Sequence, residues 1–197
     1  MMRRLLLAGL AAWLVFGPAL GRPAAQEPNP NPLQPPNRKL EFSLGLPGAA
    51  AKDDAVEVTK LLHSGSNPND ADGQGNTALI YAAMHGNAEI AKLLIGRGAA
   101  VETRDRIGNT ALHLAAQRGS VDVMTLLIAA KAAVDLPNKE GVTPLMLAAG
   151  GGQVAAVRLL MSLGADASRQ DFTGRDAPGW ASGKPAVLQV LRNAKHG

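Results

Sequence analysis

The histidines are the side chains of this sequence best suited to binding a transition metal or to acid–base catalysis. They are His63, His85, His113 and His196. Two imidazoles that share a metal on a helix stand three or four residues apart, so that both lie on one face. No two of these histidines have that spacing, and the chain has no cysteine that could complete a thiolate site. The sequence therefore predicts no metal site and no cofactor.

Two serines and a glycine run are the other features with catalytic potential. Ser120 and Ser162 have no adjacent His and Asp pair from which a catalytic triad could be built. The run at 150–152 lacks the Lys-Ser/Thr pair that follows a phosphate-binding loop. We therefore predict no catalytic residues, and a hydrolase is the least favoured alternative.

Composition limits the class of fold. The chain has 197 residues, of which 3% are aromatic, with two Trp, one Tyr and three Phe. Alanine, leucine and valine must therefore fill the interior, which argues against an aromatic-rich β-sandwich core. Without cysteine there are no disulfides, so packing has to stabilise the fold.

The first 21 residues have the pattern of a secretory signal peptide. Arg3 and Arg4 precede an apolar run over 5–16, and Pro18 stands before the small-residue site Ala19-Leu20-Gly21. A membrane span is the alternative, but it needs about 20 apolar residues. The arginine pair also allows a twin-arginine export signal. We expect export to the periplasm, with secretion as the alternative, and no membrane association after cleavage.

Cleavage after residue 21 would remove two arginines and no acid, which lowers the formal net charge from +4 to +2. So small a charge argues against a nucleic-acid partner. Residues 22–41, with prolines at 23, 28, 30, 32, 35 and 36, cannot form a core. They predict a disordered Pro/Asn-rich linker, with a ligand for a proline-binding domain as the alternative.

Residues spaced 33 apart repeat their type from about residue 42 onward. The repeated positions are Asp72, Asp105, Asn138 and Asp171; Gly75, Gly108, Gly141 and Gly174; Thr77, Thr110 and Thr143; and Leu94, Leu127 and Leu160. Each unit predicts a turn, a helix, a second turn and a second helix. Thr77, Thr110 and Thr143 can cap the first helices, and Pro144 suits a first helical turn. Alanine pairs such as Ala115-Ala116 allow neighbouring helices to pack closely.

The segments Gly-Asn-Thr-Ala-Leu-His-Leu-Ala-Ala at 108–116 and Gly-Val-Thr-Pro-Leu-Met-Leu-Ala-Ala at 141–149 resemble ankyrin repeats. The resemblance implies an all-α ankyrin-repeat solenoid, in which stacked helix-turn-helix units of 33 residues are joined by β-hairpin-like loops. It covers residues 42–195, with an N-terminal cap at 42–71, repeats at 72–104, 105–137 and 138–170, and a C-terminal cap at 171–195. It also implies structural roles for the motif residues Thr77, Thr110, Thr143, Gly75, Gly108 and Gly141.

The terminal units depart from the repeat pattern. Pro47 and Gly48 predict a short first helix, whereas Asp176, Pro178 and Pro185 replace Thr, Leu and Gly in the last unit. Lys131 occupies the position at which Gly98 and Gly164 end the second helix, and a positive φ there costs about 1 kcal/mol without glycine.

By resemblance, His113 is a structural bridge that hydrogen bonds to the backbone of an adjacent turn. Family members bind proteins on a concave face made by loop tips and first helices. We therefore expect a non-catalytic, monomeric module that binds a partner protein. An inhibitor or immunity-type protein that blocks an enzyme's active site is the alternative. The predicted partner-binding residues are Met84, His85, Arg104, Arg106, Ile107, Asn109, Gln117, Arg118, Lys139, Glu140 and Phe172.

Three features of this surface suggest how a partner is recognised. Arg104, Arg106 and Arg118 predict a cationic centre that suits an acidic partner, or else ordinary solvated charges. Ile107 and Phe172 are either interface anchors or contacts with a neighbouring loop. Glycines at 150 and 151 predict a notch without side chains.

Overall fold

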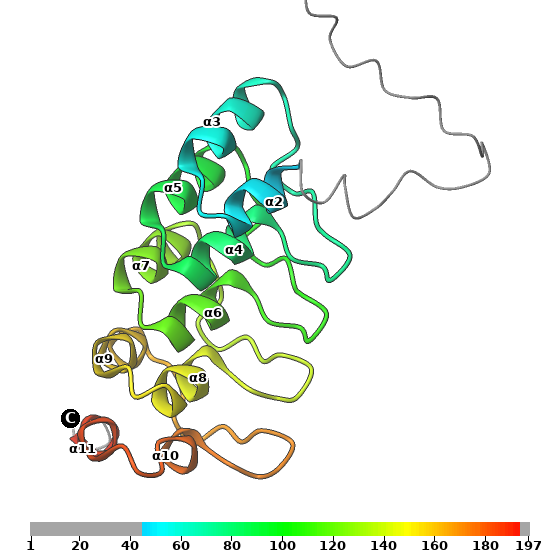
Figure 1. Cartoon of the computed structure of the whole chain (residues 1–197). Helices are drawn as coiled ribbons and strands as arrows, with labels where there is room; N and C mark the ends of the chain where they lie inside the picture. The colour runs from blue at the N-terminus through cyan, green and yellow to red at the C-terminus, as the bar shows by residue number, and fades with distance from the viewer. Residues whose placement is uncertain (1–44, 194–197) are drawn as a thin grey trace, which may run out of the picture. The chain divides into compact units, whose positions relative to one another are not determined.

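The computed structural model describes residues 45–193. The predicted signal peptide at 1–21, the linker at 22–41, residues 42–44 of the predicted N-terminal cap and His196 lie outside the described residues. The described part is an all-α solenoid of stacked helix pairs and loops, as predicted (Figure 1).

The helices form two parallel rows beside a row of loops (Figure 1). The inner row, next to the loops, contains α2 (Leu46–Ala51), α4 (Ala78–His85), α6 (Ala111–Arg118), α8 (Pro144–Gly150) and α10 (Ala177–Trp180). The outer row contains α3 (Ala55–His63), α5 (Ala88–Gly96), α7 (Val121–Ala129), α9 (Val154–Ser162) and α11 (Pro185–Asn193). Between residues 45 and 193, no helix has the length and apolar character to cross a membrane.

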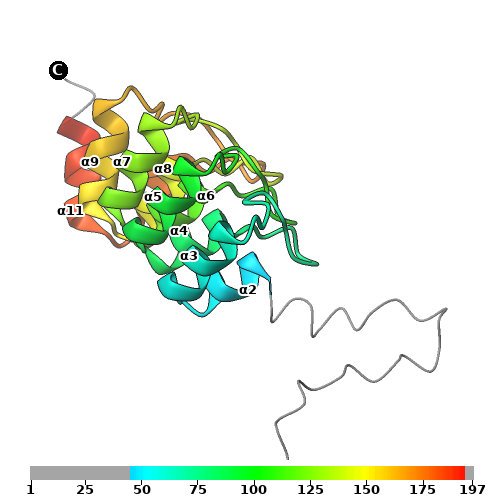
Figure 2. The same cartoon turned by 90° about the horizontal axis from the view of Figure 1, so that it is seen from above.

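The loops are joined tip to tip by backbone hydrogen bonds. The amide of Arg106 donates to the Gln74 carbonyl (2.9 Å), that of Lys139 to Ile107 (3.1 Å), and that of Phe172 to Glu140 (3.0 Å). Residues 45–193 contain no β-strand beyond one isolated bridge, Ala71 with Thr77. Because each tip bonds to the previous one, the loops lie together on one side of the helices (Figure 2).

The predicted caps begin the inner helices. The Thr77 hydroxyl accepts a hydrogen bond from the Ile80 amide (3.3 Å), and Pro144 occupies the first turn of α8. In the last unit the Asp176 carboxylate replaces threonine and accepts from the Gly179 amide (2.8 Å). The helix α2 is six residues long and starts beside Pro47, so the prediction of a short first helix is confirmed.

Small side chains between the inner helices make close stacking possible. The alanine pairs of α4, α6 and α8 are buried, and the inner helices contact one another in sequence along the stack. Between the rows, Leu94, Leu127 and Leu160 have no exposed surface. The 33-residue register therefore predicted the core positions of the three full repeats correctly.

Lys131 adopts the left-handed backbone conformation expected for a glycine position, with φ of 71°. Its side chain is exposed, so the strain has no compensating burial. We expect Lys131→Gly to raise the free energy of unfolding by up to about 1 kcal/mol, because glycine adopts positive φ without steric cost. Urea unfolding of the two chains measures this difference in free energy.

Gly98 is the matched control, with φ of 83° and open space around its Cβ position. Gly98→Lys should lower the stability by a similar amount. Opposite signs for the two exchanges support backbone strain, whereas a destabilised Lys131→Gly would contradict it.

Candidate partner-binding groove

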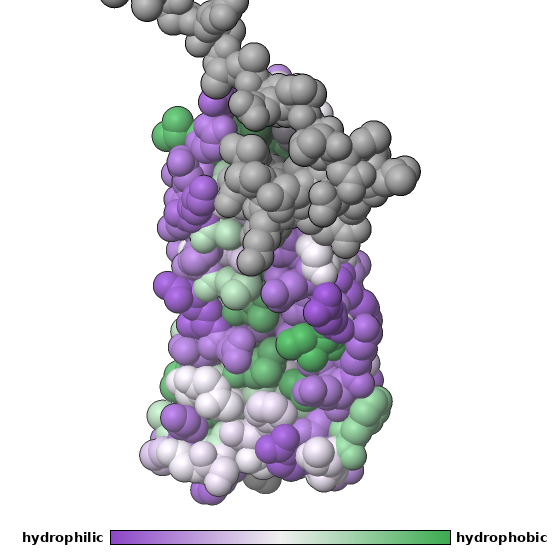
Figure 3. Space-filling model, turned by 45° about the vertical axis from the view of Figure 1, so that its right-hand side comes forward, coloured by the Kyte–Doolittle hydropathy of each residue, from purple (hydrophilic) through white to green (hydrophobic). Residues whose placement is uncertain are grey.

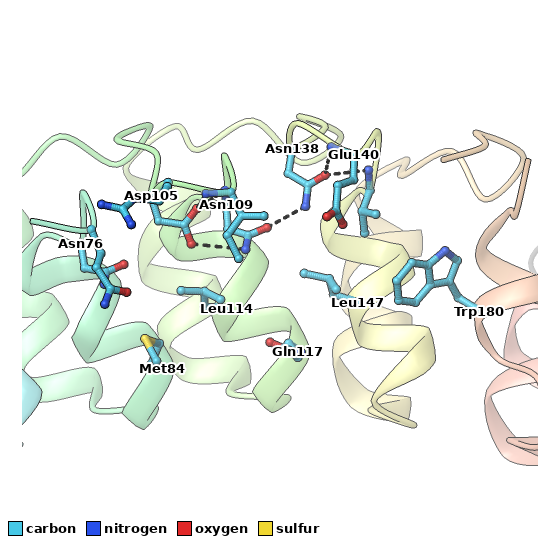
Figure 4. A pocket seen from close by; sticks show the side chains of 14 residues that line it. Asn76, Met84, Asp105, Asn109, Leu114, Gln117, Asn138, Glu140, Leu147 and Trp180 are labelled. Carbon is cyan, nitrogen blue, oxygen red and sulfur yellow. Dashed lines mark hydrogen bonds between the residues drawn. The ribbon is translucent and has the colours of Figure 1, made fainter. Parts of the chain in front are cut away.

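A groove of about 380 Å³ lies between the loops and the inner helices; we call it the concave groove (Figure 4). Its apolar lining consists of Met84, Ile107, Leu114, Val142, Leu147 and Trp180. Figure 3 shows hydrophobic side chains gathered on this side of the molecule, with hydrophilic surface to both sides. The groove therefore offers an apolar floor inside a polar rim.

Four inner-helix residues occupy the same repeat position, and three of them line the concave groove. Tyr81, Leu114, Leu147 and Trp180 are 33 residues apart. Leu114 and Leu147 lie on the floor of the groove and are half-buried, and Trp180 also lines it, whereas Tyr81 is not one of its lining residues. These positions were not predicted from the sequence, although the 33-residue register identifies them.

The two aromatic residues of this set hydrogen bond to the acid of the loop that precedes their own helix. The Tyr81 hydroxyl donates to Asp72 Oδ2 (2.7 Å), and Trp180 Nε1 donates to Asp171 Oδ2 (2.9 Å). The Thr173 hydroxyl, 2.6 Å from Asp171 Oδ1, lowers the pKa of that carboxyl well below its ordinary value, together with further donors. These hydrogen bonds hold the first and last loops against their helices.

The predicted notch at 150 and 151 is wrong. A Cβ at Gly150 would lie 3.0 Å from Trp180 Cε3, so the indole already fills the space. The Arg175 guanidinium stacks on the Trp180 ring, 4.5 Å from the ring centroid. The glycine therefore makes room for the end wall of the groove.

His113 is fully buried beneath the loop of repeat two and bridges to the next loop, as predicted. Its Nε2 donates to the Val142 carbonyl (3.1 Å), and its Nδ1 accepts from the Thr110 amide (3.2 Å). These contacts require the neutral ring. Burial lowers the pKa of His113 to about 4, more than its hydrogen bond to Val142 raises it.

The polar side chains at the bases of the loops are used within the protein. Asp105 accepts from the amides of Ile107 (2.9 Å) and Asn109 (2.8 Å), and from Asn109 Nδ2 (3.3 Å). Asn138 Nδ2 in turn donates to Asn109 Oδ1 (2.9 Å). Asn109 is only 8% exposed, so this predicted partner residue connects two loops and offers little surface.

The structure brings part of the predicted partner-binding set together. Those that line the concave groove are Met84, Arg106, Ile107, Asn109, Gln117 and Glu140. Arg118 lines a neighbouring hollow with Met84, Leu114, Gln117 and Gln153. The predicted residues that line neither the concave groove nor this hollow are His85, Arg104, Lys139 and Phe172. His85 Nε2 instead lies 3.1 Å from the Ala51 carbonyl oxygen.

The three arginines of the predicted cationic centre do not line one hollow together. Arg104 Nη1 donates to the carbonyls of Gly108 (3.2 Å) and Pro137 (2.9 Å), so it joins two repeats. Arg106 and Arg118 line different hollows. The repeat register correctly placed the loops together, but Arg104 and Arg106 hydrogen bond to backbone carbonyls of adjacent repeats.

The two apolar tip residues are both exposed. Ile107 is 51% exposed and borders the concave groove. Phe172 is 80% exposed, although its ring lies against the backbone of Gly141. Neither side chain is buried by the neighbouring loop, so both remain open to a partner.

No group of three His, Asp or Glu side chains that could hold a metal ion occurs in the described region. A family model described as Ankyrin repeats (3 copies) matches residues 48–138, 90–171 and 122–196. These matches span the fold and the concave groove.

Proposed function

Because the chain belongs to the ankyrin-repeat family, we propose that it is a non-catalytic, monomeric module whose concave groove binds a partner protein. Ankyrin repeats are generally protein–protein interaction modules, and the family is typically non-catalytic. The family thus supports binding as the activity, and the groove supplies the surface for it.

One observation carries this proposal: the groove has an apolar floor that no part of residues 45–193 covers. Met84 is 44% and Ile107 51% exposed, next to the half-buried Leu114 and Leu147. Burying such side chains under a partner is favourable, and central apolar anchors contribute much of the binding energy at protein interfaces.

Ile107→Ala should weaken partner binding by about 1 kcal/mol or more, because it removes an exposed anchor at the rim of the groove. The partner is first captured on the immobilised chain and identified by mass spectrometry. Surface plasmon resonance then compares its dissociation constant for each variant.

Val56→Ala is the matched control, since Val56 is an 80% exposed aliphatic residue on α3 that does not line the groove. It should bind as the unaltered chain does. Weaker binding to Val56→Ala with unchanged binding to Ile107→Ala would place the interface elsewhere. If the partner is an enzyme, its activity in the presence of the chain tests the inhibitor alternative.

We also propose that the protein is exported to the periplasm, or secreted, after removal of residues 1–21. The pattern of Arg3-Arg4, the apolar run and Ala19-Leu20-Gly21 supports this. Intact-mass measurement of the exported fraction should give a chain that begins near Arg22. A full-length chain in the membrane fraction would instead mean that the segment is an anchor.

A further inference from the structure

The ionised side chains that line the concave groove are Asp105, Arg106 and Glu140. Two are acidic and one is basic, so the groove has a net negative charge. This is the opposite of the cationic centre that the sequence suggested, and it changes the chemistry of the partner that the groove favours.

The basic side chains of the loop tips are directed back toward the preceding loop. Arg106 Nη2 donates to the Gly73 carbonyl (2.8 Å), and Lys139 Nζ donates to the Arg106 carbonyl (3.0 Å). Each contact joins residues that are 33 apart, so the same contact recurs between successive loops of the stack. Neither cation forms an ion pair with Glu140.

The two acids differ in what they can offer a ligand. Three N–H groups of its own loop already donate to Asp105. The Glu140 carboxylate has no hydrogen bond or ion pair within residues 45–193. In Figure 4 it points from the loop toward the side of the groove where Leu147 lies. Glu140 is therefore the acid that a partner can reach.

We propose that the concave groove recognises a basic, apolar segment of its partner protein, and this rests on the proposed function above. An aliphatic or aromatic side chain of that segment packs on Leu114 and Leu147, and a neighbouring Lys or Arg pairs with Glu140. The stem of a long basic side chain is itself apolar and suits the same floor. An acidic segment would place like charges together, which interfaces avoid.

Random 12-residue peptides displayed on phage, selected on the immobilised full chain, test this proposal. The enriched peptides should combine a large apolar residue with an adjacent Lys or Arg. Synthetic copies should bind Glu140→Lys about tenfold or more weakly than the unaltered chain, because the attraction becomes repulsion. Glu89→Gln, an acid on α5 outside the groove, is the matched control and should bind normally.

A second selection on Glu140→Lys should enrich peptides in which an acid replaces the basic residue. Thermal unfolding checks that this exposed exchange leaves the fold intact. The proposal would be overturned if the unaltered chain enriched acidic or uncharged peptides or no peptides at all. It would also be overturned if the unaltered chain and Glu140→Lys enriched the same class of peptide. A dimer of the chain that Ile107→Ala abolishes would assign the groove to a second copy and would also overturn it.

The Ile107→Ala variant separates this proposal from the function on which it rests. Peptides that lose affinity for Ile107→Ala but not for Glu140→Lys leave the groove as the binding site and refute the basic partner. A third outcome is that the selected peptides bind Ile107→Ala and Glu140→Lys as tightly as the unaltered chain. That result would place binding outside the groove and would refute both the proposed function and the basic partner.

Discussion

Leu127→Ala should lower the free energy of unfolding by about 2–5 kcal/mol, which is a large part of the stability of a typical domain. Leu127 lies in α7 of the central repeat and has no exposed surface. The helix contacts α5 and α9 on either side and α6 in its own repeat. The substitution leaves a cavity that three neighbouring helices surround, and rigid packing limits its collapse.

Urea unfolding monitored by circular dichroism gives this free energy. Thr125→Ala on the same helix is the control, because Thr125 is exposed and its hydroxyl bonds only to the Val121 carbonyl of its own helix. That exchange should change the stability far less. A loss below about 1 kcal/mol for Leu127→Ala would mean that this leucine does not belong to the shared core.

Lowering the pH from 6.5 to 4 should destabilise the protein by about 3 kcal/mol through His113 alone. Burial holds the pKa of His113 at about 4 in the folded chain, against an ordinary value of 6.5. Between these values the unfolded chain binds a proton and the folded chain does not. The contribution of the neutral histidine is therefore complete above pH 6.5 and is lost progressively as the pH falls toward 4.

His113→Gln isolates this effect, because its amide can still donate to the Val142 carbonyl but does not titrate in this range. The free energy of unfolding is measured in urea at several pH values. As the pH is lowered from 6.5 to 4, it should fall steeply for the unaltered chain and little for His113→Gln. Asp72 and Asp171 have pKa values below the ordinary 3.8, so their stabilising contributions are lost only at still lower pH. Equal slopes for both chains between pH 6.5 and 4 would show that His113 is not the titrating group.

Much of the fold could be predicted from the sequence, because each repeat contains its own local signals. The 33-residue spacing identified the repeats, and Thr77 and Thr143 begin helices as hydroxyl caps do. Lys131 at a glycine position correctly predicted a strained backbone. His113 was assigned to a bridge by resemblance, and the structure places its Nε2 on the Val142 carbonyl. These features depend on residue type and register, which the sequence displays directly.

The chemistry of the groove was decided by the tertiary structure. The register showed that the loops of repeats two and three are neighbours, but not that Arg104 and Arg106 hydrogen bond to carbonyls of adjacent repeats. Nor did it show that the Trp180 indole fills the space beside Gly150. Long side chains choose their positions according to which acceptors and surfaces stacking brings within reach, and those partners lie about one repeat away. The apolar floor and the exposed Glu140 carboxylate therefore emerge only when the repeats are stacked.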